Sequence, residues 1–200
     1  MAISLNDFLA ELYGFGQQND REHTVRHERM LNITPETGAF LELLIRSSRP
    51  EQILEIGTSN GYSTIWLAKA AMAIGARLTT VECAEDKLAL AQANFAECGL
   101  TGAIEVIHAD AGAYLADLAD GSIDFLFLDS ERSEYSSWWP HLDRVLSRQG
   151  LLVVDNAISH QTELQSFMAA ISADERFITS LIPIGNGEFT ALKISQLALA

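Results

Sequence analysis

The sequence has few cysteines and few basic residues, and both shortages limit what the protein can be. Its two cysteines, Cys83 and Cys98, are too few for a disulfide framework and form no CxxC pair, so a reducing cytoplasm is the simplest expectation. Only 13 basic residues stand against 27 acidic ones, which gives a formal net charge of −14. A surface of that sign repels phosphate backbones and argues against nucleic acid as a partner.

Long apolar runs are absent as well, so we expect no membrane span. The stretch MAISLNDFLAELYGFG carries two acids and no basic residue before Arg21, which is unlike a secretory signal. What is present is a globular composition, because 48% of the 200 residues are hydrophobic and 20% are charged. We expect a single domain, over residues 1–200, with a sizeable core.

Apolar strands alternate with helices along most of the chain. Strands are expected at residues 52–56, 77–82, 103–107, 123–128 and 151–154, and helices at 61–74, 85–98, 112–118, 136–147 and 161–171. Strands that are apolar throughout are typical of a parallel sheet with helices on both faces. The closing segments FITSLIPIG and GEFTALKI flank Asn186 and predict an antiparallel hairpin.

The N-terminal quarter predicts helices of a different kind. Ser4 is a good N-cap for a short helix that should stop near Gly14. Residues 20–31 mix both charge signs and indicate an exposed helix or lid. Thr34 and Pro35 open a further helix through about residue 47. We therefore expect residues 1–48 to form a helical cap on a core of residues 49–200.

The first strand ends in ILEIGTSNGYST, at the edge of the sheet where ligands bind in open α/β folds. Gly57 lets the chain turn sharply, and Gly61 lets the next helix begin close to a ligand. The GxxxG spacing lacks the GxGxxG of dinucleotide-binding proteins, so NAD and FAD are disfavoured. A plain glycine turn is the alternative, and the turn alone does not decide between the two.

Acids at the next two strand ends favour a nucleoside ligand. Glu82 ends its strand 25 residues after Gly57, where a carboxylate can accept both hydroxyls of a ribose. Asp110 follows the third strand, where it could bond an adenine amino group or cap the next helix, and Ala111 leaves room for a ring. Helix capping is also the alternative for Glu82, but Glu85 and Asp86 already serve it.

In this order and spacing, LEIGTSNGYST, VEC, HADA, DFLFLDSER and VVDN resemble the class I S-adenosylmethionine-dependent methyltransferases. Within that class they resemble the catechol/caffeoyl-CoA O-methyltransferase-like branch, from about Leu31 to the final hairpin. The resemblance implies a Rossmann-like, seven-stranded, mostly parallel sheet with a reversed last strand. It also implies methyl transfer from S-adenosylmethionine to a small hydroxylated acceptor.

The resemblance also implies which residues bind the cofactor. Glu82 would hold the ribose, Asp110 and Ala111 would face the adenine, and the backbone of Ile33 would touch the cofactor. Cys83 would lie along the adenine, although small core filler is an equal alternative for it. The full implied set is Ile33, Glu55, Gly57, Thr58, Ser59, Gly61, Ser63, Glu82, Cys83, Asp110, Ala111 and Asp129.

Two carboxylates and an amide follow two consecutive apolar strands. Asp129 ends DFLFLD, and Asp155 with Asn156 ends LLVVDN, so adjacent parallel strands would bring the three together. These hard oxygen ligands suit Mg²⁺ or Ca²⁺, or Mn²⁺. Aspartates often end strands and Asp-Asn is a common turn pair, which is the alternative. The resemblance favours the metal, which would lower the pKa of the acceptor hydroxyl.

Arg132 departs from the family pattern, which usually has a lysine three residues after the first aspartate as general base. A guanidinium stays protonated, so Arg132 cannot act as a base. We expect Asp129 and Arg132 to be the catalytic residues. Arg132 would stabilise an anionic or ionised acceptor, and a solvated loop cation is the alternative for it. Glu131 could pair with it. His160 is the nearest candidate base in sequence, although a histidine in a loop is more often on the surface.

Three further features are open. His23 and His27 lie one helical turn apart, a metal-binding spacing that more often marks a solvated helix. Of Trp138 and Trp139, one should be exposed, in an acceptor pocket or a homodimer interface. Arg132 in place of lysine also keeps two alternatives open, a metal-independent methyltransferase and a non-catalytic protein that binds S-adenosylmethionine. We expect a cytoplasmic homodimer.

Overall fold

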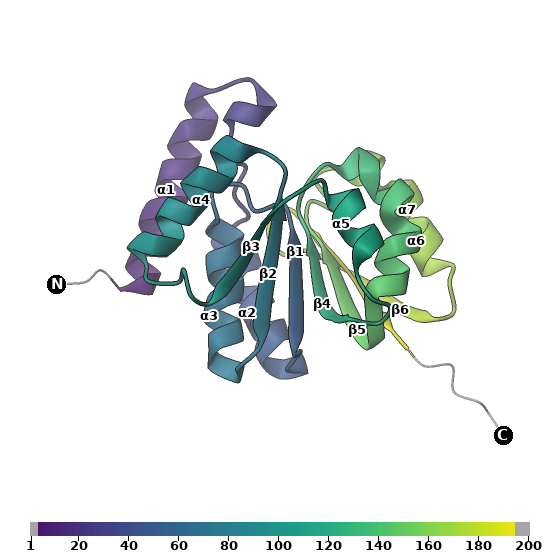
Figure 1. Cartoon of the computed structure of the whole chain (residues 1–200). Helices are drawn as coiled ribbons and strands as arrows, with labels where there is room; N and C mark the ends of the chain where they lie inside the picture. Colours follow the sequence, from purple (N-terminus) through teal and green to yellow (C-terminus); the bar gives the residue numbers. More distant parts are fainter. Residues whose placement is uncertain (1–3, 195–200) are drawn as a thin grey trace.

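The computed structural model describes residues 4–194 and contains one seven-stranded sheet (Figure 1). The strands are β1 (Gln52–Ile56), β2 (Arg77–Glu82), β3 (Ile104–His108), β4 (Ile123–Leu128), β5 (Leu146–Val154), β6 (Phe177–Ile182) and β7 (Glu188–Lys193). Their spatial order is β3-β2-β1-β4-β5-β7-β6. Strands β1 to β5 pair in parallel, and β7 runs antiparallel to both of its neighbours. The Rossmann-like α/β fold and its closing hairpin are confirmed.

Seven helices cover the sheet on both faces, with α1 to α4 on one side and α5 to α7 on the other (Figure 1). They are α1 (Leu5–Glu22), α2 (Pro35–Ser48), α3 (Tyr62–Ile74), α4 (Glu85–Glu97), α5 (Ala111–Asp117), α6 (Tyr135–Val145) and α7 (Gln161–Ser172). Two short 3₁₀ turns, η1 (Arg26–Glu28) and η2 (Arg132–Glu134), interrupt the connections. Each face of the sheet buries its own apolar cluster, and β4 alternates Phe125 and Phe127 into one with Leu126 and Leu128 into the other.

The N-terminal prediction needs two corrections. Helix α1 does not stop near Gly14 but continues to Glu22, because its buried face runs through Leu12 to Gly16. A side chain at Gly16 would collide with Asn32, so the glycine there serves close packing despite its poor helix propensity. Residues 20–31 are not a separate helix; they hold the end of α1, the η1 turn and extended chain. The division of the chain into a helical cap of residues 1–48 and a core of residues 49–200 stays a prediction. Residues 1–3 and 195–200, at the two ends of the chain, lie outside the described residues.

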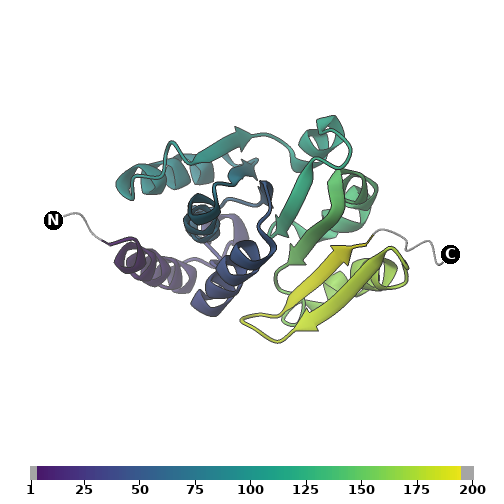
Figure 2. The ribbon, with the colours of Figure 1, turned by 90° about the horizontal axis from the view of Figure 1, so that it is seen from below.

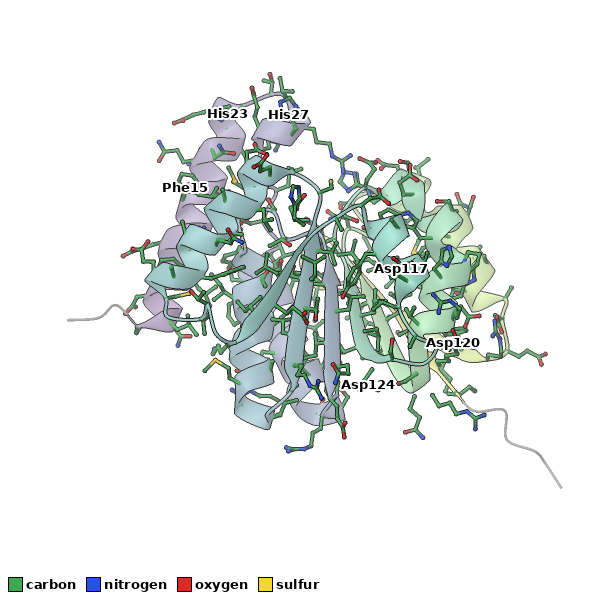
Figure 3. All side chains as sticks on the ribbon, in the orientation of Figure 1. Phe15, His23, His27, Asp117, Asp120 and Asp124 are labelled. Carbon is green, nitrogen blue, oxygen red and sulfur yellow. The ribbon has the colours of Figure 1, made fainter. Side chains whose placement is uncertain are left out.

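The carboxyl ends of the parallel strands lie at the same end of the molecule as the connection between α1 and α2 (Figure 1). In Figure 3, His23 and His27 lie at the top, whereas Asp124, near the start of β4, lies at the bottom. The hairpin of β6 and β7 lies at the opposite side of the sheet from β3 (Figure 2). None of the helices within residues 4–194 has the length and apolar content that a membrane crossing requires.

Removal of a central core ring should cost far more than removal of a surface ring. We expect Phe125→Ala to lower the free energy of unfolding by about 3–5 kcal/mol, because Phe125 is fully buried on the central strand β4. Phe15→Ala is the matched control, since Phe15 is 48% exposed, and it should cost less than about 1 kcal/mol. Urea unfolding of both variants measures the difference, and equal losses would contradict this description of the core.

Candidate active site

The turn after β1 is shaped by contacts within the protein. Gly57 has a φ of +105°, and a Cβ on it would lie 2.1 Å from the backbone oxygen of Asp129. Gly61 caps α3 with a φ of +86°, and a Cβ there would collide with Phe95. Both glycines are therefore required by backbone conformation and by close packing. The turn brings the end of β1 into direct contact with the end of β4.

Glu55 lies fully buried beneath this turn. Its carboxylate accepts hydrogen bonds from the hydroxyls of Ser63, Thr64 and Thr80, and Thr80 is in turn bonded to Thr58 at 2.6 Å. Burial raises the pKa of Glu55 to about 7, against the lowering effect of the three hydroxyls. Predicted cofactor residues Glu55 and Ser63 thus contact each other, and the oxygens of Glu55 are occupied by hydroxyl donors.

Glu82 ends β2 and accepts hydrogen bonds from backbone amides on two sides. Its Oε2 accepts from the amide of Ser59 at 2.9 Å, and its Oε1 accepts from the amides of Cys83 and Ala84 at 3.0 and 2.9 Å. The predicted ribose acid is therefore tied to the glycine turn. Cys83 is exposed, and the pKa of its thiol is raised by partial burial and by the adjacent Glu82 carboxylate.

Asp110 caps α5, as one of its two predicted roles requires. Its Oδ1 accepts from the amide of Ala113 at 2.8 Å, and the side chain is exposed at the end of β3. Ala111 is buried, and the indole of Trp138 lies against the neighbouring Gly112. Ile33 is 1% exposed. The residues that we predict to bind the nucleoside therefore include side chains at the ends of the adjacent strands β1, β2 and β3.

Asp129, Asp155 and Asn156 meet at the ends of the paired strands β4 and β5. The amide nitrogen of Asn156 lies 3.2 Å from Asp129 Oδ1 and 2.7 Å from Asp155 Oδ2. Asp155 is 2% exposed, and its Oδ1 is buried without a hydrogen-bond partner among the described residues. Burial raises the pKa of Asp129 well above its usual value, and the Asp155 carboxylate adds to the effect.

Glu188, at the start of β7, belongs to the same cluster but was not predicted. It is fully buried, its Oε1 accepts from the hydroxyl of Thr37 at 2.9 Å, and its Oε2 is buried without another partner among the described residues. Burial and the Asp155 carboxylate raise the pKa of Glu188 to about 10. A proton on Glu188 gives it a hydrogen bond to Asp155, which satisfies buried oxygens on both acids.

Arg132 points toward α7. Its Nε donates to Glu163 Oε2 at 2.8 Å, and its side chain is only 9% exposed. The predicted partner, Glu131, instead faces Arg26 at 3.6 Å, so that prediction is wrong. The reason is the η2 turn, which begins at Arg132 and directs successive side chains to different neighbours. The Arg132 charge lowers the pKa of both Asp129 and Asp155, although burial outweighs it.

Other candidate residues have different surroundings from those expected. Trp138 and Trp139 are both partly buried against the core, Trp139 on Phe167 and Phe177, so neither is the exposed wall that we expected. His23 directly follows α1 and His27 lies in the η1 turn, so the two histidines do not share a helix face. The Nδ1 atom of His160 lies 2.9 Å from the hydroxyl of Ser159. Within residues 4–194, no three His, Cys, Asp or Glu side chains gather as a metal group.

Signals for the missed residues were present but faint. Glu188 is a lone acid in the apolar segment GEFTALKI, yet its position opposite Asp155 depends on the pairing of β7 with β5. Lys87, Ala91 and Phe95 follow one another at intervals of four residues, on the buried face of α4. That spacing predicts that Lys87 is buried. It does not predict the hydrogen-bond partners of Lys87, which lie in a segment far away in the sequence.

This chain is similar in sequence to known O-methyltransferases. The pattern of the O-methyltransferase family matches residues 14–194. A putative O-methyltransferase of Mycobacterium avium is 31% identical over 174 residues, which covers 80% of this chain and 78% of that protein. A catechol O-methyltransferase of Niastella koreensis is 37% identical over 132 residues, 64% of this chain, and the match spans only 59% of that relative's length.

Solved structures share the fold. A methyltransferase of Podospora anserina bound to SAH superimposes with a TM-score of 0.80 at 20% identity, covering 94% of this chain and 88% of the other. An O-methyltransferase from Bacillus cereus in complex with SAH gives a TM-score of 0.76 at 23% identity, covering 94% and 90%. At these identities the likeness establishes the architecture.

The buried Glu55 should make stability fall as pH rises. Its pKa of about 7 in the folded protein exceeds the ordinary value of 4.5, so the folded state holds a proton that the unfolded state has lost. Wild type should lose about 3 kcal/mol of unfolding free energy through this group as pH rises through that window. Glu55→Gln should lack this part of the decline in urea titrations between pH 4.5 and 8. The exposed Glu105→Gln is the control and should retain it, whereas an equal decline in Glu55→Gln would contradict the assignment.

Glu188 should tolerate an amide but not truncation. At pH 7 we expect Glu188→Gln to stay within about 1 kcal/mol of wild type, because an amide can donate to Asp155 and accept from Thr37 as a protonated acid does. Glu188→Ala should lose roughly 2–4 kcal/mol by leaving a cavity and two unpaired groups. Urea unfolding measures both, and a Gln variant as unstable as the Ala variant would indicate an ionised Glu188.

Proposed function

This chain belongs to the family of S-adenosylmethionine-dependent O-methyltransferases, and from that membership we propose that it methylates a hydroxyl oxygen of a small molecule. One observation carries the proposal. The ends of five adjacent parallel strands present, in spatial order, Asp110, Glu82, the glycine turn, Asp129 and Asp155 with Asn156. Such an edge can hold a nucleoside cofactor beside a polar acceptor site.

The cofactor would lie along the ends of β1 to β4. Glu82 would bind the ribose with the oxygens that now accept from Ser59, Cys83 and Ala84, and Asp110 would face the adenine. When bound, S-adenosylmethionine supplies a methyl group on a positively charged sulfur, which needs little activation. The chain's task is therefore to hold that methyl group and an acceptor oxygen in line.

A divalent cation would be held by Asp129, Asp155 and Asn156. The fit rests on the chemistry of the donor set, two carboxylates and an amide whose oxygens are hard ligands, and the cation would lower the pKa of the acceptor hydroxyl. Because the amide nitrogen of Asn156 now faces both carboxylates, its side chain would have to turn over to offer its oxygen. Asp129 and Asp155 would have to give up any proton that they carry.

Arg132 would supply a permanent positive charge next to this centre and would take no proton. Its bond to Glu163 holds the guanidinium in place, and its field favours the ionised forms of Asp129 and Asp155. It would stabilise negative charge on the acceptor. The hydroxyl proton has to go to another group or to water.

A metal-independent methyltransferase is the second candidate. It is favoured by the Asn156 nitrogen, which already bridges the two aspartates. A third candidate, a protein that binds S-adenosylmethionine without transferring its methyl group, rests on the missing lysine base at Arg132.

We also propose a cytoplasmic homodimer that binds no nucleic acid. The two free cysteines support a reducing compartment, and the net charge of −14 opposes a phosphate backbone. Ile178 and Leu181 are exposed on the edge strand β6, and this supports association with a second copy.

The direct test combines calorimetry with methyl transfer to catechol-type acceptors. The folded protein should bind S-adenosylmethionine and S-adenosylhomocysteine, and excess chelator should lower the transfer rate about a hundredfold. Asp155→Ala should abolish the binding of Mg²⁺ or Mn²⁺ in calorimetry, because it removes one of the two carboxylates. Asp117→Ala is the control, since Asp117 is exposed on α5 away from the strand ends. Full activity in chelator would select the metal-independent candidate, and tight cofactor binding without turnover would select the third.

A further inference from the structure

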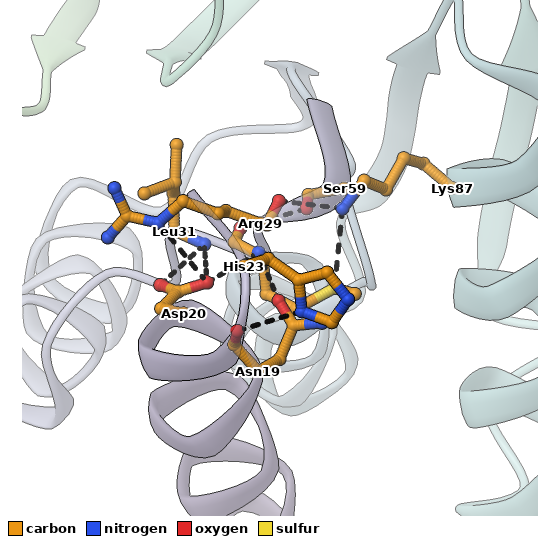
Figure 4. Close-up of polar contacts among 8 residues, drawn as sticks. Asn19, Asp20, His23, Arg29, Leu31, Ser59 and Lys87 are labelled. Carbon is orange, nitrogen blue, oxygen red and sulfur yellow. Dashed lines mark hydrogen bonds and ion pairs between the residues drawn. The ribbon is translucent and has the colours of Figure 1, made fainter. Parts of the chain in front are cut away.

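The extended segment of residues 29–31, here called the strap, is fastened to three separate elements (Figure 4). It lies between the η1 turn and the start of α2, two residues before the predicted cofactor residue Ile33. Its backbone groups bond to the end of α1, to the glycine turn and to α4. Such a density of side-chain contacts is unusual for a connection without regular structure.

The end of α1 holds the strap by its amides. Asp20 Oδ1 accepts from the amide of Met30 at 2.7 Å, and Asp20 Oδ2 accepts from the amide of Leu31 at 3.1 Å. An acid in the last turn of a helix is disfavoured by the helix dipole, so these bonds offset an unfavourable position. Leu31 has a φ of +51°, a left-handed conformation that a leucine keeps only when its surroundings impose it.

Ser59 joins the strap to the ribose acid. Its hydroxyl donates to the carbonyl of Met30 at 3.0 Å, while its amide donates to Glu82 Oε2 at 2.9 Å. Like Leu31, Ser59 is left-handed, with a φ of +48°. A displacement of the strap would therefore release Ser59 and with it one of the amides that orient Glu82.

Lys87 closes this network from α4. It is only 8% exposed, and its ammonium donates to the carbonyl of Arg29 at 2.7 Å and contacts the sulfur of Met30 at 3.4 Å. Buried lysines are rare unless they are paired, and within residues 4–194 the hydrogen-bond partners of this one both lie in the strap. Burial lowers the pKa of Lys87, while Asp86, Asp20 and Glu82 oppose that shift.

The structure assigns Lys87 as a positioning residue for the cofactor. Through the strap it holds Ser59, and through Ser59 it holds Glu82, in the geometry that binds the ribose. This inference rests on the proposed function, because it takes S-adenosylmethionine as the ligand of Glu82. The half-exposed ion pair of Arg26 with Glu131, which precedes the strap, is weak. The strap is therefore held in place by Lys87, by Ser59 and by Asn19 and Asp20 at the end of α1.

The test measures retention of S-adenosylhomocysteine in three lysine variants. Lys87→Met keeps the length of the side chain and removes its donors, and we expect the Kd to rise about tenfold through faster dissociation. The KM for S-adenosylmethionine should rise while kcat stays close to wild type. Lys87→Arg should restore most of the affinity. Lys69→Met is the matched control, because Lys69 lies on α3 and bonds Glu42 and Asn6.

Trypsin provides a second readout, because Arg29 lies in the strap. S-adenosylhomocysteine should protect the bond after Arg29 in wild type and in Lys69→Met, but much less in Lys87→Met. If Lys87→Met fails to fold, Asp20→Ala takes its place in the test. This variant loosens the strap from α1, and we expect it to reproduce both the loss of affinity and the loss of protection. Unchanged affinity and protection in Lys87→Met and Asp20→Ala would overturn this inference and would leave the proposed function standing. Failure of wild type to bind S-adenosylhomocysteine would overturn the proposed function and this inference with it.

Discussion

The burial of carboxyl groups at the ends of parallel strands is the constraint on which the rest of this structure depends. Glu55, Asp155 and Glu188 are each at most 2% exposed, and Asp129 lies beside them. An isolated buried carboxylate is costly, so each must gain hydrogen bonds, keep a proton or bind a cation. Glu55 accepts from hydroxyls, Glu188 has a raised pKa that favours its protonated form, and Asp129 with Asp155 have one amide between them. Apolar residues in these places would also give a stable fold, and buried carboxyls with raised pKa values are typical of functional sites.

Local sequence patterns predicted the strands and helices of the repeated strand–helix units. Short apolar runs between helices identified β1 to β5, because buried parallel strands need continuous apolar residues. A glycine turn marked the end of β1, and an acid marked the end of each of the others. The same reasoning placed Asp129 and Asp155 together. It failed for α1, where Gly14 suggested an end that the buried face through Leu12 and Gly16 overrides. It also failed for Glu188, because a partner across β5 and β7 depends on strand register, which no local pattern contains.

Side-chain partners separated by long stretches of chain could not be predicted for the same reason. Glu131 is adjacent to Arg132 in sequence, yet the partner of Arg132 is Glu163 on α7, 31 residues away. Lys87 contacts Arg29, 58 residues earlier. Electrostatic pairing depends on distance in space, and the packing of α7 and α4 on the sheet sets that distance. The residue types at the site were therefore predictable, whereas their pairing required the fold.

The glycine turn after β1 joins the two halves of the site. Its first residue, Gly57, packs directly on the carbonyl of Asp129, and its third, Ser59, bonds both Glu82 and the strap. The proposed acceptor side and the proposed cofactor side thus share one short and strained piece of backbone. Because close-packed structures adjust by discrete shifts, a displacement at either end of this turn has to be accommodated at the other. The geometry of methyl transfer, which requires the two sides in line, would therefore be set by the turn more than by any single side chain.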